Sequence, residues 1–343
     1  MQMTYRELKD EIAKIIPRNI EYEVDLEAGN IAIITTNMKP FTGQDGLIGK
    51  IARRIKRKIV LRTPIDAMMD MDEAKDVIND IIPDDADITE MYFDACYREV
   101  TIQCRQPGTA IGRRGENSNA IRDKTGWAVK VERTPPLFSK TVHDIRMYRQ
   151  THGDERRKLL KDFGLNIHRP TRPGGTWARV TALGSYREVG RACHYVTTNE
   201  SRIMIDVGVN IASDTDPMPF FNAPEALPLD KLDAVVLTHS HLDHAGMLPV
   251  LFKYGYRGPV YCTPPTRDLM LLLQTDYLKV GGAEGKRTPY DMEDIRMCMK
   301  HVVDVDWDST TDIAPDVKLT FSNAGHILGC LLYTSDAADE GSS

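Results

Sequence analysis

The stretch THSHLDHAG, residues 238–246, places three histidines and an aspartate within six positions, although the whole chain contains only nine histidines. It directly follows the apolar run LDAVVL, which predicts a buried strand that ends where these polar residues begin. Enzymes built on α/β sheets place their chemistry at the carboxyl ends of strands, and neutral imidazole and carboxylate are good ligands for Zn²⁺. The spacing H-x-H-x-D-H therefore predicts two adjacent metal sites, the first held by His239 and His241 and the second by Asp243 and His244.

The bulk composition bounds the class of protein. A chain of 343 residues predicts two or three domains, and 41% hydrophobic with 27% charged residues is the balance of a globular protein. No apolar stretch approaches the length of a membrane span, and the amino terminus is mixed in charge, unlike a signal peptide. The six cysteines form no CxxC pair, which favours free thiols in a reducing cytoplasm over disulfides or a cysteine zinc site. The net charge of −6 does not by itself suggest a nucleic-acid partner.

The first 140 residues contain one pattern twice. The tripeptide IIP occurs at 15–17 and again at 81–83, and RTP occurs at 62–64 and again at 133–135. Around these anchors both copies have the same order of a helical stretch, two strand-like runs, a glycine-bearing turn, a helix and a closing strand. A duplication of this size predicts two sibling domains, each with its own core. Their expected boundaries are 1–66 and 67–140.

This order of elements resembles the KH domain in its prokaryotic arrangement, in which a GxxG turn clamps the backbone of a nucleic acid. The turn of the second copy, GRRG, fits this role, because glycines allow close approach to a phosphate and arginines add positive charge. The amide groups that begin the next helix would also point at the phosphate. The expected RNA contacts are Gly112, Arg113, Arg114 and Gly115, and a purely structural turn is the alternative.

The first copy departs from the KH pattern. Its turn reads GQDG, and Asp45 within it would repel a phosphate, so we expect no binding at this turn. The helix that follows compensates with six cations, namely Lys50, Arg53, Arg54, Lys56, Arg57 and Lys58. Such a run is either a solvated helix face or an RNA contact, and the sequence leaves both interpretations open.

A connector is expected over residues 141–177. A charged helical segment there gives way to Arg-Pro and Pro-Gly-Gly, which is typical of a domain boundary. Three histidines in or near this connector have no partner at ligand spacing, so they are interpreted as ordinary surface residues: His143, His152 and His168. After the connector the pattern changes to successive strands, which predicts a third domain over 178–329.

The motif NAGHILG at 323–329, together with H-x-H-x-D-H, resembles the metallo-β-lactamase superfamily. The resemblance implies that His326 completes the first metal site. It also implies that Asp206, which ends the strand RIMID, supports the metal loop from outside the ligand set. The expected fold is therefore mixed α/β: two KH-like αββαβ domains followed by a partial metallo-β-lactamase αββα domain.

Two KH-like modules ahead of such a domain narrow the resemblance further. With the stretches TALGSYREVGRACH and KYGYRGPVYCTPPTRDLMLLLQTDY, residues 1–329 resemble the archaeal homologues of the cleavage and polyadenylation specificity factor nuclease, which are β-CASP ribonucleases. The resemblance implies a zinc-dependent endoribonuclease that cuts single-stranded RNA, as in 3′-end formation at transcription termination. It implies two zinc ions and a catalytic Asp243 that holds a metal and orients or deprotonates the attacking water. It further implies a homodimer in full-length relatives, association with RNA polymerase, and no membrane partner.

The resemblance ends after Gly329. The remainder, CLLYTSDAADEGSS, lacks the expected hairpin and Gly-Asp strand end, and Asp336 follows His326 too closely to supply that aspartate. We therefore expect residues 330–343 to be an atypical tail from truncation or misassembly, and the second metal site to be incomplete. Two other functions stay open: an RNA-binding protein with an inactive hydrolase core, and a small-molecule hydrolase such as a thioesterase. The latter ranks last, because it gives the KH-like modules no purpose.

Overall fold

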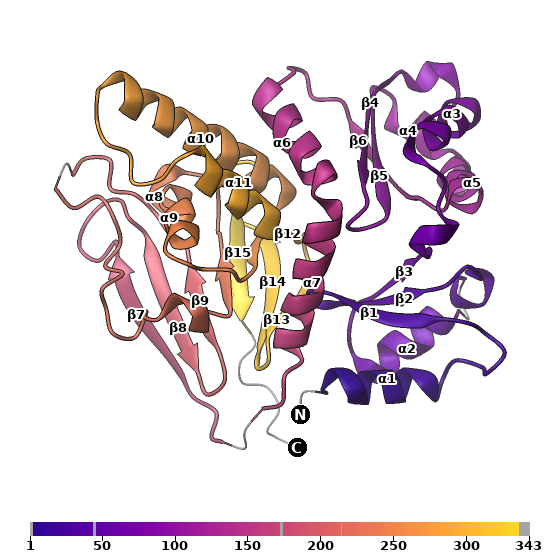
Figure 1. The fold of residues 1–343 in the computed structure, drawn as a ribbon, viewed down its shortest axis with the longest axis horizontal. Coiled ribbons are helices and arrows are strands. Elements are labelled where there is room, and N and C mark those ends of the chain that lie inside the picture. Colours follow the sequence, from indigo (N-terminus) through magenta and orange to yellow (C-terminus); the bar gives the residue numbers. More distant parts are fainter. Residues whose placement is uncertain (1–2, 44–45, 172–173, 214, 336–343) are drawn as a thin grey trace. The chain divides into compact units, whose positions relative to one another are not determined.

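The computed structural model describes residues 3–43, 46–171, 174–213 and 215–335, with side chains described as far as residue 330. Contacts divide the chain into two compact units, Arg6–Lys161 and Met1–Tyr5 together with Asp162–Ser343. Figure 1 shows the course of the chain through both units. Among the described residues, no helix combines the length and apolar character that crossing a bilayer requires.

The first half of the unit Arg6–Lys161 is a small three-stranded sheet with two helices. Strands β1 and β2 pair antiparallel, and β2 pairs parallel with β3. The elements are α1 Tyr5–Ala13, β1 Glu23–Glu27, β2 Asn30–Ile34, the 3-10 turn η1 Lys39–Phe41, α2 Leu47–Ile55 and β3 Ile59–Arg62.

The second half repeats this topology. Strands β4 and β5 pair antiparallel, and β5 pairs parallel with β6. The elements are α3 Met71–Ile81, β4 Ile88–Asp94, β5 Glu99–Cys104, α4 Pro107–Ile111, α5 Glu116–Thr125 and β6 Ala128–Arg133. The order expected from the repeat is present in both halves. They differ in that the helix α4 stands where the first half has only the 3-10 turn η1, and in two short 3-10 turns of the second half, η3 Asp84–Ala86 and η4 Arg113–Gly115.

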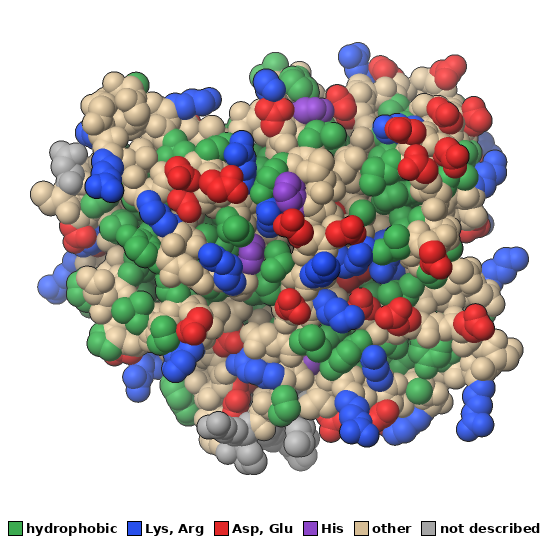
Figure 2. Space-filling model, in the orientation of Figure 1, with side chains coloured by type: hydrophobic (Ala, Val, Ile, Leu, Met, Phe, Trp, Pro, Cys, Tyr) green, Lys and Arg blue, Asp and Glu red, His purple; other side chains and the backbone are tan. Residues whose placement is uncertain are grey.

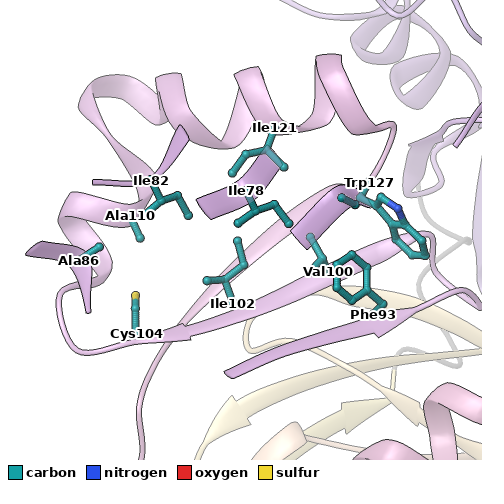
Figure 3. Packing of buried hydrophobic residues seen from close by; sticks show 11 residues of the cluster. Ile78, Ile82, Ala86, Phe93, Val100, Ile102, Cys104, Ala110, Ile121 and Trp127 are labelled. Atoms are coloured by element: carbon teal, nitrogen blue, oxygen red, sulfur yellow. The ribbon is translucent and has the colours of Figure 1, made fainter. Parts of the chain in front are cut away.

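The core of the second half lies between its helices and its sheet (Figure 3). Ile78 of α3 and Ile121 of α5 are fully buried against the strand residue Ile102. Phe93 and Trp127 meet edge to face with ring centroids 4.9 Å apart. Burial of side chains this large contributes about 1.5–3 kcal/mol each, so this half has a core of its own.

Two more helices, α6 Lys140–Thr151 and α7 Gly153–Ile167, form most of the expected connector. Buried ion pairs join α7 and the two halves. The Arg156 side chain of α7 donates to Asp94 at 2.8 Å, and Glu27 of the first half binds Arg62 at 2.8 Å and lies 3.8 Å from Arg98 of the second half. The division between the two units falls inside α7, earlier than the Pro-Gly-Gly segment predicts.

The unit that holds residues 162–335 contains a six-stranded sheet in the order β12-β11-β10-β9-β8-β7. Strands β7, β8 and β9 pair antiparallel, and β9 through β12 pair parallel. The strands are β7 Ala178–Gly184, β8 Cys193–Thr198, β9 Arg202–Ile205, β10 Ala234–Val236, β11 Val260–Cys262 and β12 Val302–Asp304. Its helices are α8 Leu242–Ala245, α9 Leu248–Lys253, α10 Pro264–Ala283 and α11 Met292–His301.

A second, antiparallel sheet of this unit has the order β13-β14-β15, with β13 Thr310–Ala314, β14 Val317–Asn323 and β15 Leu331–Ser335. Part of the tail expected over 330–343 therefore forms a strand beside β14, and Asp336 lies outside the described residues. The surface position expected for His168 is wrong. The last turn of α7 packs into this unit, so His168 is only 3% exposed, with Nδ1 3.3 Å from the Met3 carbonyl oxygen.

Candidate metal centre and nucleic-acid interface

The polar residues of the predicted metal loop stand at the carboxyl ends of two neighbouring parallel strands. Strand β10 pairs with β9 so that Val236 lies opposite Ile205. Asp206 therefore leaves one strand beside the point where the chain leaves the other toward Thr238 and His239. Because β10 is buried throughout, the backbone at its end is held in place by packing, and so are the positions from which these side chains start.

Three of the predicted ligands converge. One side-chain nitrogen from each of His239, His241 and His326 lies within 4.8 Å of the other two. His326 belongs to the loop between β14 and β15, and its ring centroid is 5.2 Å from those of both other histidines. Three imidazoles at this spacing fit a Zn²⁺ ion, which binds histidine nitrogen at about 2.0–2.1 Å and leaves a fourth position for water.

Asp206 organises the loop by hydrogen bonds. Its buried carboxylate accepts the Thr238 amide at 2.8 Å and the Thr238 hydroxyl at 2.8 Å, and it binds Nδ1 of His244 at 2.8 Å. The Thr238 oxygen is in turn 3.0 Å from Nδ1 of His239. Since the Thr238 proton goes to Asp206, Nδ1–H of His239 donates to Thr238, and both histidines keep Nε2 for a metal.

The pKa values of His239 and His244 are shifted in opposite directions. Burial and the neighbouring histidines lower the pKa of His239 to about 4, although Asp206 opposes this shift. Burial also disfavours protonation of His244, but the hydrogen bond and charge of Asp206 outweigh it and raise the pKa of His244. His239 is therefore neutral near pH 7, which is the form that binds metal.

Asp243 and His244 form the expected second pair. The Asp243 carboxylate lies 3.5 Å from Nε2 of His244, and the ring centroids of His244 and His239 are 4.0 Å apart. Beyond this pair, the described residues contribute no further ligand to a second site. That the histidine triad binds a metal ion, and that the Asp243–His244 pair binds a second one, stays a prediction.

Sequence reasoning missed two supports of the loop. Thr238 links Asp206 to His239, and its position directly before the motif is the one signal that could have indicated this. Gly208 is the other, because a side-chain carbon there would stand 1.7 Å from the Asp243 carbonyl oxygen. Only glycine lets the chain after β9 pass so close to the metal loop.

The GRRG turn joins α4 to α5 in the second KH-like half. Gly112 and Gly115 have positive φ of 75° and 78°, and a side chain on Gly112 would approach Glu116 to 2.8 Å. Arg113 and Arg114 are exposed, and their guanidinium groups have no partner within the described chain. The turn therefore offers two uncommitted cations at the start of a ten-residue helix. Its contact with RNA stays a prediction.

In the first half, Gln44 and Asp45 of the GQDG turn lie outside the described residues. Helix α2 buries Ile51 and Ile55 and contains no acidic residue. Its cations at 50, 53 and 54 lie three and four positions apart and so share one face of the helix. Arg54 pairs with Glu11 at 2.8 Å, whereas three exposed cations have no ion pair in the described ranges: Lys50, Arg53 and Lys56.

A family model described as the metallo-beta-lactamase superfamily domain matches residues 195–340, and one described as the KH domain of transcription termination factor FttA matches residues 2–68. The chain is 43% identical over 324 residues to transcription termination factor FttA of Methanosarcina mazei, covering 94% of this chain and 51% of the relative. It is 44% identical over 336 residues to FttA of Methanococcus maripaludis, covering 97% and 52%. It is 38% identical over 330 residues to FttA of Lokiarchaeum, covering 96% and 52%.

The FttA proteins are close homologues of this chain. The two family models confirm the mixed α/β fold class, in which a KH domain precedes a metallo-β-lactamase domain. The chain spans about half the length of the curated relatives that it matches. The motifs quoted from the sequence end at Gly329, but the metallo-β-lactamase match continues to residue 340.

The metallo-β-lactamase match also bears on the chemistry of the histidine cluster. A metallo-β-lactamase domain with a three-histidine cluster implies a divalent metal ion.

Proposed function

We propose that this chain carries the RNA-binding and catalytic parts of a zinc-dependent endoribonuclease that cuts single-stranded RNA. The observation that carries the proposal is the convergence of His239, His241 and His326 in a chain that also contains a KH domain. The relatives are named transcription termination factors, which supports a role in forming RNA 3′ ends at termination. Such work would take place in the cytoplasm beside RNA polymerase, and full-length proteins of this kind would act as homodimers.

In this proposal the histidine triad holds one zinc ion, and Asp243 with His244 contributes to a second. Zinc, when bound, supplies a Lewis acid for phosphate oxygens and lowers the pKa of a water toward neutrality. Asp243 orients the attacking water and accepts its proton, and its side chain is 43% exposed, so water and substrate can reach it. Asp206 fixes the tautomer of His244 and, through Thr238, that of His239.

The RNA is bound through its backbone by the second KH-like half. Arg113 and Arg114 are exposed beside glycines whose backbone lets a phosphate approach closely. Neutralising phosphates releases counterions, so binding should weaken steeply with salt. Helix α2 adds a second basic surface if its uncommitted cations contact RNA. Acidic and basic side chains are interspersed over the face shown in Figure 2. Helix α2 differs from this mixed pattern, because it contains no acidic residue.

An RNA-binding protein with an inactive core is the second candidate. It is favoured by the second metal pair, which has only Asp243 and His244 among the residues that the structure describes. A thioesterase-like hydrolase ranks below both, because it leaves the KH match without a purpose.

The test is to strip the purified chain of metal, reload it with zinc, and incubate it with a labelled unstructured RNA. We expect retained zinc and zinc-dependent internal cuts, both lost in His239→Ala. The control is His194→Gln, a histidine on β8 of the same unit that lies outside the cluster. Zinc uptake and RNA binding without cleavage would favour the inactive core, and thioester hydrolysis without RNA binding would favour the third candidate.

A further inference from the structure

Helix α10 buries polar side chains that the chemistry above does not use. Thr266 and Gln274 of this helix, and Thr263 at its N-cap, are each 0% exposed. Burying a hydroxyl or an amide without a hydrogen bond costs about 1–3 kcal/mol. The partners of these three side chains therefore indicate what the helix is built to hold.

The two threonines hold the loop that carries His326. The Thr266 hydroxyl donates to the carbonyl oxygen of Gly329 at 3.0 Å. The Thr263 hydroxyl lies 3.0 Å from the same carbonyl and 2.9 Å from the Thr266 oxygen, and its single proton serves one of them at a time. The loop is closed on itself, because the Ala324 amide donates to the Cys330 carbonyl at 3.2 Å. Fixing Gly329 therefore fixes the segment between these residues.

The last glycine of NAGHILG is shaped for this contact. Gly329 has a φ of +89°, and a side-chain carbon there would stand 2.7 Å from the Thr266 oxygen and 2.9 Å from the Thr266 amide nitrogen. Both the backbone conformation and the close approach require glycine. The loop therefore sits directly against the first turn of α10.

Gln274 makes the equivalent contact with the other ligand-bearing segment. Its Nε2 donates at 2.8 Å to the carbonyl oxygen of Ala245, the last residue of α8. Ala245 directly follows His244, and its carbonyl is one of those that a helix end leaves without an internal partner. Thr266 and Gln274 are eight residues apart, so two turns of α10 place them on one buried face, with the buried Met270 between them.

We propose that α10 positions the metal centre by holding both ligand-bearing segments: Thr266, with Thr263, sets the His326 loop, and Gln274 sets the turn that carries Asp243 and His244. These are positioning residues and not ligands. The inference rests on the metal site of the proposed function. Its consequence is that one rigid helix keeps in register ligands that lie more than 80 residues apart in the sequence.

The test measures Co²⁺ and Zn²⁺ binding by the full chain after metal removal. Thr266→Val keeps the shape of the side chain and removes the donor, and we expect affinity to fall about tenfold, the lower end of what loss of a supporting hydrogen bond costs. The visible absorption of bound Co²⁺ should also change in band position or intensity at saturation. Thr266→Ser restores the hydroxyl and should restore both readouts.

Thr275→Val is the matched control, because Thr275 lies on the same helix and its buried hydroxyl has no hydrogen-bond partner among the described residues. Affinity and spectrum should be unchanged in this control. Gln274→Met should weaken binding as Thr266→Val does. The thermal unfolding of each metal-free variant reports general damage separately.

Three outcomes decide the matter. Unaltered affinity and spectrum in Thr266→Val and Gln274→Met, while the unmodified chain binds metal, would overturn the positioning role alone. A loss in Thr266→Val that Thr266→Ser does not rescue, or one matched by equal loss of metal-free stability, would also overturn it. No metal bound by the unmodified chain would remove the metal site of the proposed function and this inference with it.

Discussion

The metal centre and the GRRG turn recognise charge in opposite ways. In the first, the side chains of His239 and His244 are fixed by hydrogen bonds, His239 to the half-buried Thr238 and His244 to the buried Asp206. In the second, Arg113 and Arg114 are exposed and uncommitted among the described residues. Coordination requires several atoms at defined distances at once, whereas attraction to a polyanion adds up over many loosely placed cations. Substitutions should therefore act steeply at the first site and gradually at the second.

The two KH-like halves also differ in how they present their cations. The second half presents its cations on a glycine turn that follows the helix α4, and the first half has only a 3-10 turn at that point and its cations on α2. A turn with close backbone approach can grip one phosphate. A helix face offers charge without that grip. We therefore expect the first half to add to RNA affinity less per cation than the second.

The largest effect is expected at the triad. His239→Ala removes a ligand, so zinc affinity should fall by more than the about 100-fold that loss of a supporting partner can cost. Metal content after dialysis, measured by atomic absorption, checks this. RNA binding should stay unchanged, because the KH-like halves belong to the other unit. A parallel loss of RNA binding would break the separation between the two sites.

The second largest effect is expected at Asp206, which supports the metal loop by hydrogen bonds. Asp206→Asn keeps the shape but removes the negative charge that orients the Thr238 hydroxyl and the His244 ring. Zinc affinity should fall about 10- to 100-fold, as measured by competition with a chromophoric chelator. Asp316→Asn, a change of the same kind in the same unit, serves as the control, since Asp316 binds Ser201 and Glu200 outside the cluster. Equal effects of the two substitutions would contradict the special role of Asp206.

Sequence reasoning predicted the metal loop at 239–244 because its candidate ligands stand within six positions. His326 required the resemblance to a known superfamily, since nothing local marks a single histidine as a ligand. The contacts of Thr266 with Gly329 and of Gln274 with Ala245 join residues 63 and 29 positions apart. Such pairs depend on how the segments pack, and no periodic pattern predicts them. For the same reason the buried position of His168 was missed: its neighbour is Met3, which lies 165 residues away.

Substitutions in the GRRG turn should give a smaller and salt-dependent effect. Arg113→Ala with Arg114→Ala removes two cations, so the dependence of log affinity on log salt should become shallower by about 1.4 for single-stranded RNA. Filter binding at several salt concentrations measures this slope, and zinc content should not change. Affinity lost with an unaltered slope would mean that the arginines support the turn and do not neutralise phosphates.

The smallest effect is expected on α2, where it separates the two interpretations of the basic helix. The triple variant Lys50→Ala, Arg53→Ala and Lys56→Ala removes exposed cations without an ion pair in the described chain, and keeps the Arg54–Glu11 pair. If this face contacts RNA, affinity at low salt should fall by less than in the GRRG double variant, although one more charge is lost. The control removes three exposed cations of the other unit, namely Lys231, Lys279 and Arg287. Equal losses of RNA affinity in the two triple variants would show that α2 is a solvated face that acts only through net charge. A loss of affinity larger than that of the GRRG variant would mean that the first half contributes more to RNA binding than the second.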